Sequence, residues 1–438
     1  MSLLAFLILL FVAGAICWWV FSVHAFSPPI SADEVHTITT PDRWHLRLCR
    51  HKAKSGPGEP VLMVHGFMST QFNFSLPAGA SMADALAAAG YDCWLIDLRG
   101  NSCAIPPFGH SLNEAGVDDY ILKDIPTAIQ YIRKMTGYEK VHWVGHSMGG
   151  MLLYAYDAVL GSAELASGTT LGSPIGFHDV PFKRPGWAFV LRRSSRLAFR
   201  CGQRLLISIC HFFKPQLAFL PINYENMNPI LDASAMFSTM DAPPLGVSES
   251  LAKAAESHVW RVKNESMDVF DHLKELQVPL FAIFGAADPF VPVVHAETFF
   301  REIKNPDKRF LVLSKANGHA ADYSHVDLVF GREAKKDVFD PVIEWLRAHA
   351  IARQTGRTDK PLEAAGTNDS ATSEAPKTGK RASATAKVSK GGSVAAAMRK
   401  SPVKAAAAPK KAAVSKAKPA KKTSVSRKST PKQKDQSK

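Results

Sequence analysis

Short apolar runs alternate with segments of helical periodicity between residues 34 and 350. A strand that is covered on both faces is apolar at consecutive positions, so the runs predict buried strands. These runs occupy 60–65, 91–98, 140–145, 169–172, 279–285 and 309–313. Helical spacing marks 82–89, 117–136, a segment that begins near Ser147, and 340–350. Strands that alternate with helices predict an α/β fold, with a mostly parallel sheet flanked by helices.

The alternation stops in an insertion at about residues 175–274. This stretch is rich in aromatic residues and arginine, among them Trp187, Phe189, Arg192, Arg193 and Arg196. We expect a helical lid or cap over one end of the sheet. In one interpretation the insertion walls an apolar substrate pocket and touches lipid. In the other it is a cap whose arginines form a solvated face.

The N-terminal segment is uncharged over residues 3–23. As a helix it would span about 31 Å, the thickness of a bilayer core, and the pair Trp18 and Trp19 suits a membrane interface. We therefore expect a transmembrane anchor over residues 1–25. The alternative is a cleaved signal peptide that ends near Ala25. The length of the run and the lack of a preceding Lys or Arg favour the anchor.

Basic residues follow this apolar segment, beginning at Arg43, and none precedes it. The positive-inside rule then favours a body that faces the cytoplasm. We expect a single-pass protein of a bacterial inner membrane in that orientation.

The positive charge of the chain lies in its C-terminal tail. The net charge is +14, but residues 353–438 hold 22 Lys and Arg and 5 Asp and Glu, which gives that segment +17. It contains no Phe, Trp or Tyr, so it is predicted to be disordered. Its Lys/Ala/Pro composition resembles linker-histone tails. This predicts nonspecific binding of nucleic acid or anionic lipid by counterion release, and a solubilising tail without a partner is the alternative.

The strongest chemical motif is Gly145-His146-Ser147-Met148-Gly149, which fits G-x-S-x-G between a predicted strand and a predicted helix. In that setting the serine occupies a sharp turn that exposes its hydroxyl, and the start of the helix favours developing negative charge. We expect Ser147 to be a catalytic nucleophile and His146 to be a packed neighbour.

A serine nucleophile needs a base that takes its proton and a carboxylate that orients the base. Asp288 follows the predicted strand at 279–285, so it lies at the carboxyl edge of the sheet and is the expected acid. Two histidines follow the last strand, His319 and His325, and their spacing does not decide which is the base. Backbone N–H groups of Phe67 and Met148 are the expected oxyanion donors, because each follows its strand end at the required place.

Several segments resemble the α/β-hydrolase superfamily, and within it the acid lipase branch that includes lysosomal and gastric lipases. The matching segments are HGF at 65–67, ALAAAGYDCWLIDLRGNS at 85–102, DIPTAIQYIRKMTG at 124–137, GHSMG at 145–149 and YSHVD at 323–327. The resemblance covers residues 34–350 apart from the insertion. It implies an α/β-hydrolase fold with His325 as the base and His319 as the alternative. The G-x-S-x-G motif at 145–149 departs from GHSQG, which is usual in this branch. Secreted members of the branch also lack this anchor and tail. Polyhydroxyalkanoate synthases also look similar, but they need cysteine at the position of Ser147.

The leading hypothesis is a membrane-anchored serine hydrolase of lipid-like carboxylic esters that needs no metal and no cofactor. An acyltransferase with the same three residues is an alternative, because another alcohol or thiol would then replace water. A membrane-tethered polyanion-binding scaffold with a vestigial hydrolase body is a second alternative. The six cysteines form no CxxC pair, so we expect neither a zinc site nor a disulfide framework.

Overall fold

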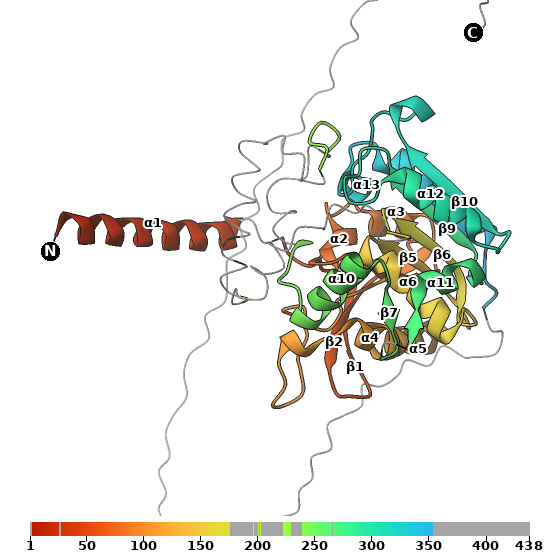
Figure 1. Cartoon of the computed structure of the whole chain (residues 1–438), viewed down its shortest axis with the longest axis horizontal. Coiled ribbons are helices and arrows are strands. Elements are labelled where there is room, and N and C mark those ends of the chain that lie inside the picture. The colour runs from red at the N-terminus through yellow and green to blue at the C-terminus, as the bar shows by residue number, and fades with distance from the viewer. Residues whose placement is uncertain are drawn as a thin grey trace, which may run out of the picture. The chain divides into compact units, whose positions relative to one another are not determined.

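A computed structural model describes residues 2–25, 28–175, 196, 200, 202, 222–228, 239–264 and 266–353. An eight-stranded sheet in the order β1-β2-β4-β3-β5-β6-β9-β10 forms its centre (Figure 1). The strands are β1 (Glu34–Thr39), β2 (His45–His51), β3 (Glu59–Val64), β4 (Tyr91–Ile96), β5 (Val141–His146), β6 (Leu165–Leu171), β9 (Leu280–Gly285) and β10 (Lys308–Leu313). The contacts of β2 with β1 and β4 are antiparallel and all other pairs are parallel, so the predicted mostly parallel sheet is confirmed.

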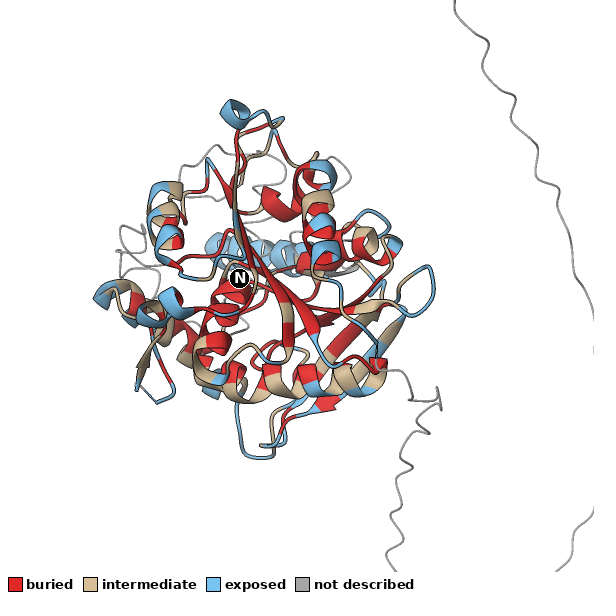
Figure 2. Cartoon of the chain, turned by 90° about the vertical axis from the view of Figure 1, so that its right-hand side faces the viewer, coloured by how far each residue is buried: buried red, intermediate tan, exposed pale blue. Residues whose placement is uncertain are grey.

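Helices cover both faces of this sheet. They are α2 (Phe72–Ser75), α3 (Met82–Ala88), α4 (Val117–Asp119), α5 (Ile125–Thr136), α6 (Met148–Leu160), α10 (Leu245–Ser257), α11 (Val269–His272), α12 (Val293–Glu302), α13 (Asp327–Phe330) and α14 (Asp340–Ala348). Side chains of α5, α6 and α12 join one core cluster, and side chains of α3, α13 and α14 join the other. Neighbouring residues of β3 alternate between the clusters, with Leu62 in the first and Met63 in the second. Figure 2 shows the buried strands enclosed by helices whose outer turns are exposed.

The helix predicted over 117–136 is present but is not uniform. A π-helical turn at Tyr120–Asp124 separates α4 from α5. Pro126 lies in the first turn of α5 and has no N–H to donate, which accounts for the wider turn before it. Gly137 ends the helix in the left-handed conformation, with φ of 77°.

The insertion is described only in part. Residues 176–195, 203–221 and 229–238, which include most of its predicted aromatic and arginine residues, lie outside the described residues. The described part contains α10, a short hairpin of β7 (Arg261–Val262) and β8 (Met267–Asp268), and α11.

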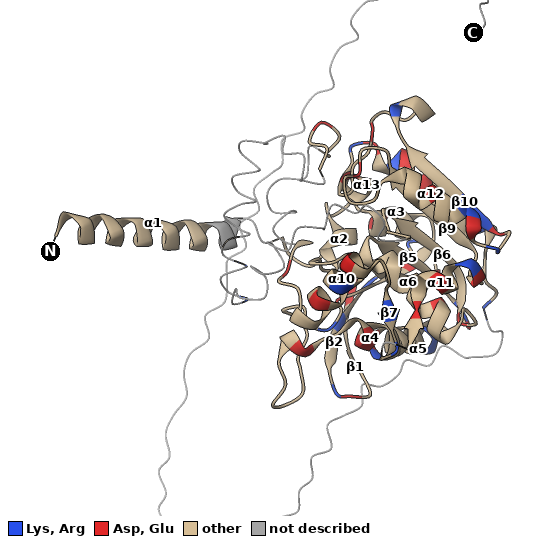
Figure 3. Ribbon diagram, in the orientation of Figure 1, with Lys and Arg blue, Asp and Glu red and all other residues tan. Residues whose placement is uncertain are grey.

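The N-terminal helix α1 (Leu3–Ala25) carries no charged side chain (Figure 3). Among the helices that the structure describes, it is the one that is long and apolar enough to cross a membrane. A signal sequence near an N-terminus meets the same description.

The last described residues are held at the amino edge of the parallel strands. The amide of Ile351 donates to the carboxylate of Glu59, the first residue of β3, at 2.9 Å. Arg353 forms an antiparallel bridge with Tyr138, which lies just before β5.

Candidate active site

Ser147 lies in a strained turn between β5 and α6. Its φ of 54° and ψ of −118° are rare for a residue with a side chain, and such a conformation costs about 1–3 kcal/mol. The turn is tight because Gly149 packs directly on β3, where a Cβ atom would overlap the carbonyl of Val64. Ser147 is half-buried, whereas His146 and Met148 on either side are buried. The strain holds the serine hydroxyl at the carboxyl edge of the sheet, as the motif predicts.

Asp288 lies in the loop after β9 with its carboxylate fully buried. Its Oδ1 accepts hydrogen bonds from the amides of Phe290 at 2.8 Å and Val291 at 3.2 Å. Its Oδ2 lies 2.7 Å from Nδ1 of His325. The two oxygens therefore have separate tasks: one fixes the loop and the other faces the histidine.

The structure brings His325, and not His319, to Asp288. The ring of His325 is also in edge contact with Phe290, with 5.3 Å between ring centroids. His319 is half-buried in the turn after β10, where its Nδ1 lies 3.2 Å from the carbonyl oxygen of Ser314. The loop of His325 closely approaches the end of β9, because Gly285 has no side chain that would overlap the carbonyl of Tyr323.

The Ser147 turn and the His325–Asp288 pair meet through β6. The next residue after β6 is Gly172, and a Cβ atom there would lie 3.1 Å from His325 Nδ1 and 3.3 Å from Asp288 Oδ2. Among the described residues there is no hydrogen bond between Ser147 Oγ and His325 Nε2. Catalytic hydrogen bonds in structures without substrate are often long, and they tighten when substrate binds.

The loop after β3 passes directly beside Ser147. A Cβ atom on Gly66 would lie 3.1 Å from Ser147 Cβ, so the backbone just before Phe67 lies close to the serine. Met148 directly follows Ser147 and is the first residue of α6. The backbone amides of Phe67 and Met148 stay the predicted oxyanion donors.

Several residues that hold this loop were not predicted from the sequence. His65 Nε2 accepts from the Leu98 amide at 3.3 Å and lies 3.0 Å from Asn101 Nδ2, while burial lowers the pKa of His65 and keeps it neutral. The amide of Asp241 donates to the carbonyl of Met68 at 2.9 Å. Buried polar groups of this kind have no pattern in the sequence, because their partners are distant along the chain.

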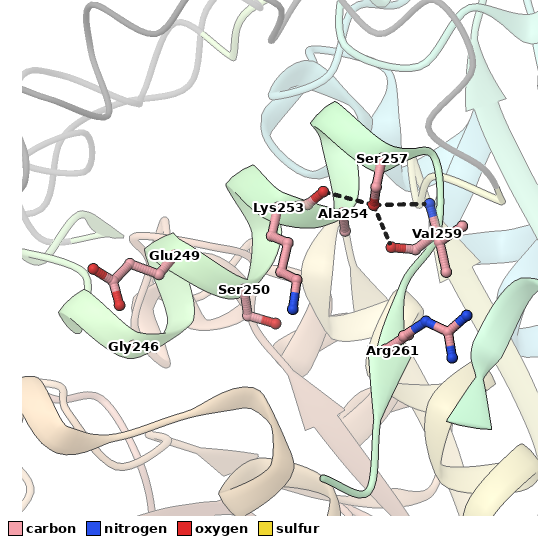
Figure 4. A pocket seen from close by; sticks show the side chains of 8 residues that line it. All are labelled: Gly246, Glu249, Ser250, Lys253, Ala254, Ser257, Val259 and Arg261. Atoms are coloured by element: carbon pink, nitrogen blue, oxygen red, sulfur yellow. Dashed lines mark hydrogen bonds between the residues drawn. The ribbon is translucent and has the colours of Figure 1, made fainter. Parts of the chain in front are cut away.

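A surface hollow of about 650 Å³ lies along α10 (Figure 4). Its charged lining residues are Glu249, Lys253 and Arg261, and it shares no lining residue with the Ser147 site. Within the described ranges there is no group of three or more His, Cys, Asp or Glu side chains that could hold a metal ion. Cys17, Cys49, Cys93 and Cys103 are free thiols.

Comparison with known proteins agrees with this architecture. The sequence profile described as alpha/beta hydrolase fold matches residues 59–323. Triacylglycerol lipase 1 of Arabidopsis thaliana is 25% identical, over 72% of this chain and 86% of the relative. The tear acid lipase-like protein of Mesocricetus auratus is 33% identical, over 64% of this chain and 77% of the relative.

Among solved structures, the esterase EaEST from Exiguobacterium antarcticum aligns with 72% of this chain and 100% of its own, at 18% identity and a TM-score of 0.49. The profile match covers more than half of the chain, and the family resemblance of the sequence motifs is thereby confirmed. The chain therefore belongs to the α/β-hydrolase family, in its acid lipase-like branch, and is a lipase/esterase-type enzyme.

Proposed function

We propose that this protein hydrolyses lipid-like carboxylic esters with Ser147 as nucleophile, His325 as base and Asp288 as the acid that orients the base. The observation that carries the proposal is the buried 2.7 Å contact between His325 Nδ1 and Asp288 Oδ2 beside the strained turn of Ser147. Relatives named as lipases support ester substrates.

In the proposed reaction, Ser147 Oγ attacks the ester carbonyl carbon while its proton passes to His325 Nε2. The Asp288 carboxylate accepts from Nδ1–H and stabilises the imidazolium. The amides of Phe67 and Met148 donate to the oxyanion. The tetrahedral intermediate collapses to an acyl-Ser147, and the leaving alcohol takes the proton from His325. Water, deprotonated by His325, then releases the carboxylic acid and regenerates the serine.

The test is labelling with a fluorophosphonate probe, which forms a bond to an activated serine. Wild type is expected to label, whereas Ser147→Ala and His325→Gln are expected not to label. His319→Gln serves to separate the two candidate bases, because it is expected to label at the wild-type rate. Labelling of Ser147→Ala would refute the nucleophile, and loss confined to His319→Gln would exchange the bases.

The substrate class is tested by a chain-length series of p-nitrophenyl esters. A lipid-like substrate predicts a higher kcat/KM for octanoyl than for acetyl esters. Preference for acetyl would remove the lipase assignment. Product analysis with an added alcohol acceptor separates hydrolysis from acyl transfer.

We propose a domain organisation in which residues 1–25 anchor a hydrolase domain at 34–350 and residues 353–438 form a basic tail. The uncharged helix α1 supports the anchor. The basic residues that follow it, beginning at Arg43, favour a body that faces the cytoplasm. N-terminal sequencing of the mature protein distinguishes a retained anchor from a cleaved signal sequence.

A further inference from the structure

His146 directly precedes Ser147 at the end of β5, and its ring is buried. Its Nε2 lies 3.2 Å from the backbone carbonyl oxygen of His325. The rings of the two histidines are in contact, with 4.8 Å between their centroids. The side chain of His146 therefore links the backbone next to the proposed nucleophile with the peptide group of the proposed base.

We propose that His146 is a positioning residue, which sets the distance between Ser147 and His325 by donating its Nε2–H to the His325 carbonyl. This inference rests on the proposed function, because it assigns a role to His146 only if Ser147 and His325 react together.

The loop that carries His325 has few other contacts that would hold the peptide group of His325 itself. The amide of Ala287 donates to the Tyr323 carbonyl at 2.9 Å, and Asp327 Oδ1 accepts from the Ser324 amide at 2.9 Å. Both contacts fix the loop before His325. The His146 bond is the one in the described structure that reaches the carbonyl of His325. A misplacement of about 1 Å costs roughly a hundredfold in rate in a well-ordered active site, so a single bond at this point matters.

The ring can donate from only one nitrogen. Burial, with a smaller effect from His325, lowers the pKa of His146 to about 3, so the imidazole is neutral and carries one N–H. Donation from Nε2 makes Nδ1 an acceptor. The atom 3.0 Å from Nδ1 is Oδ1 of Asn73, which is also an acceptor, while Nδ2 of the same amide is buried without a partner.

A half-turn of the Asn73 amide removes the clash between the two acceptors. It exchanges Oδ1 and Nδ2 without moving other atoms, and the two atoms have nearly the same shape and size. Nδ2 then donates to His146 Nδ1 and reaches Ser69 Oγ, which lies 3.2 Å from that position. The exchange gives up the longer contact of 3.4 Å with the Gly66 amide and leaves Oδ1 at the buried position that has no partner. The opposite tautomer would instead direct a lone pair of Nε2 at the His325 carbonyl in a buried site, which is repulsive.

The experiment compares two substitutions in the full-length protein. His146→Phe keeps a ring but removes the donor, and His146→Gln keeps an N–H at a similar reach. For His146→Phe we expect kcat for a p-nitrophenyl ester to fall about tenfold or more with KM within twofold, and the rate constant of fluorophosphonate labelling to fall in parallel. His146→Gln is expected to stay within about threefold of wild type. His51→Phe changes another buried histidine, on β2, and is the control that should leave kcat unchanged.

Equal kcat for His146→Phe and wild type would overturn the proposal, and so would a His146→Gln variant as slow as His146→Phe. Melting temperatures show whether each variant is folded. If His146→Phe does not fold, ¹⁵N NMR of histidine-labelled wild type decides instead: protonated Nε2 at His146 is expected, and protonated Nδ1 refutes the role. Failure of wild type to label would count against the proposed function, and not against the tautomer of His146.

Discussion

The backbone amide of Ser147 donates a hydrogen bond to the carbonyl of Leu171 at 2.8 Å. This bond ties the strained turn to the last residue of β6. The following residue, Gly172, has φ of 55° and lies against both His325 and Asp288. The three proposed catalytic groups, which are far apart in the sequence, therefore share one rigid support at the end of a central strand.

Gly172→Ala is predicted to impair catalysis directly. Its Cβ would lie 2.9 Å from Leu328 Cδ1 and 3.1 Å from His325 Nδ1, so the ring must shift. We expect kcat to fall at least tenfold, measured with a p-nitrophenyl ester. Gly161→Ala is the matched control, because it also has positive φ, 79°, but nothing lies within 4 Å of its Cβ position. Equal loss in both variants would mean that backbone strain, and not contact with His325, is responsible.

Asp288→Asn is predicted to lower kcat by about 10³–10⁴-fold while the protein stays folded. The amide no longer stabilises the imidazolium, and it favours the wrong tautomer of His325. Oδ1 still accepts from Phe290 and Val291, so the loop keeps its shape. Steady-state kinetics and the melting temperature check both parts. Asp307→Asn removes an exposed carboxylate that contacts His349 and should leave kcat at the wild-type value.

Acid is predicted to destabilise the fold partly through His146. The pKa of this histidine is about 3 in the folded protein, because of burial and then of His325, against an ordinary value of 6.5. Above pH 6.5 the side chain is neutral in both states and contributes no pH dependence. Between pH 6.5 and 3 the unfolded chain binds a proton that the folded chain does not. The free energy of unfolding therefore falls by up to about 1.4 kcal/mol per pH unit as the pH falls.

His146→Gln removes this ionisation. Denaturant unfolding at pH 7, 6, 5 and 4 should show a shallower decline for the variant than for wild type. His65 also has a pKa lowered by burial, but it is present in both proteins and cancels in the difference. If the free energy of unfolding declined equally with pH in the variant and in wild type, His146 would be protonated to the same extent in the folded and unfolded states. That result would contradict the prediction.

Removal of residues 354–438 is predicted to leave kcat within about twofold of the full chain and to abolish binding to DNA. The removed segment holds 21 of the 22 basic residues after position 352, whereas the proposed catalytic residues lie in the retained part. Binding by counterion release should weaken steeply between 50 and 200 mM salt. DNA binding that survives truncation would assign it to the hydrolase domain.

Local patterns predicted the central strands and the helix faces, because burial on both sides leaves consecutive apolar residues. They did not predict β1 and β2. In β1, EVHTIT, exposed residues alternate with two half-buried residues and with buried Ile38 at an edge of the sheet, so the apolar signal is weak. The strand predicted at 169–172 begins earlier, at Leu165. The prediction began too late because the small and polar residues of its first half interrupt the apolar run. Gly168 is needed there, since a Cβ would overlap Leu153.

The site was predicted to the extent that a motif carries it. Ser147 and Asp288 each follow the end of a predicted strand, so the sequence indicated where both would lie. The choice between His319 and His325 depends on a tertiary contact across 37 residues, which spacing alone does not contain. His146 was expected to be only a packed neighbour, because the sequence does not show which carbonyl its ring faces.

The contacts of Ile351 with Glu59 and of Arg353 with Tyr138 place the end of the described domain at the edge opposite to Ser147. A fusion partner or a solid support that is joined at this point would therefore lie away from Ser147. Ester substrates would still have access to the edge of the sheet that carries the serine.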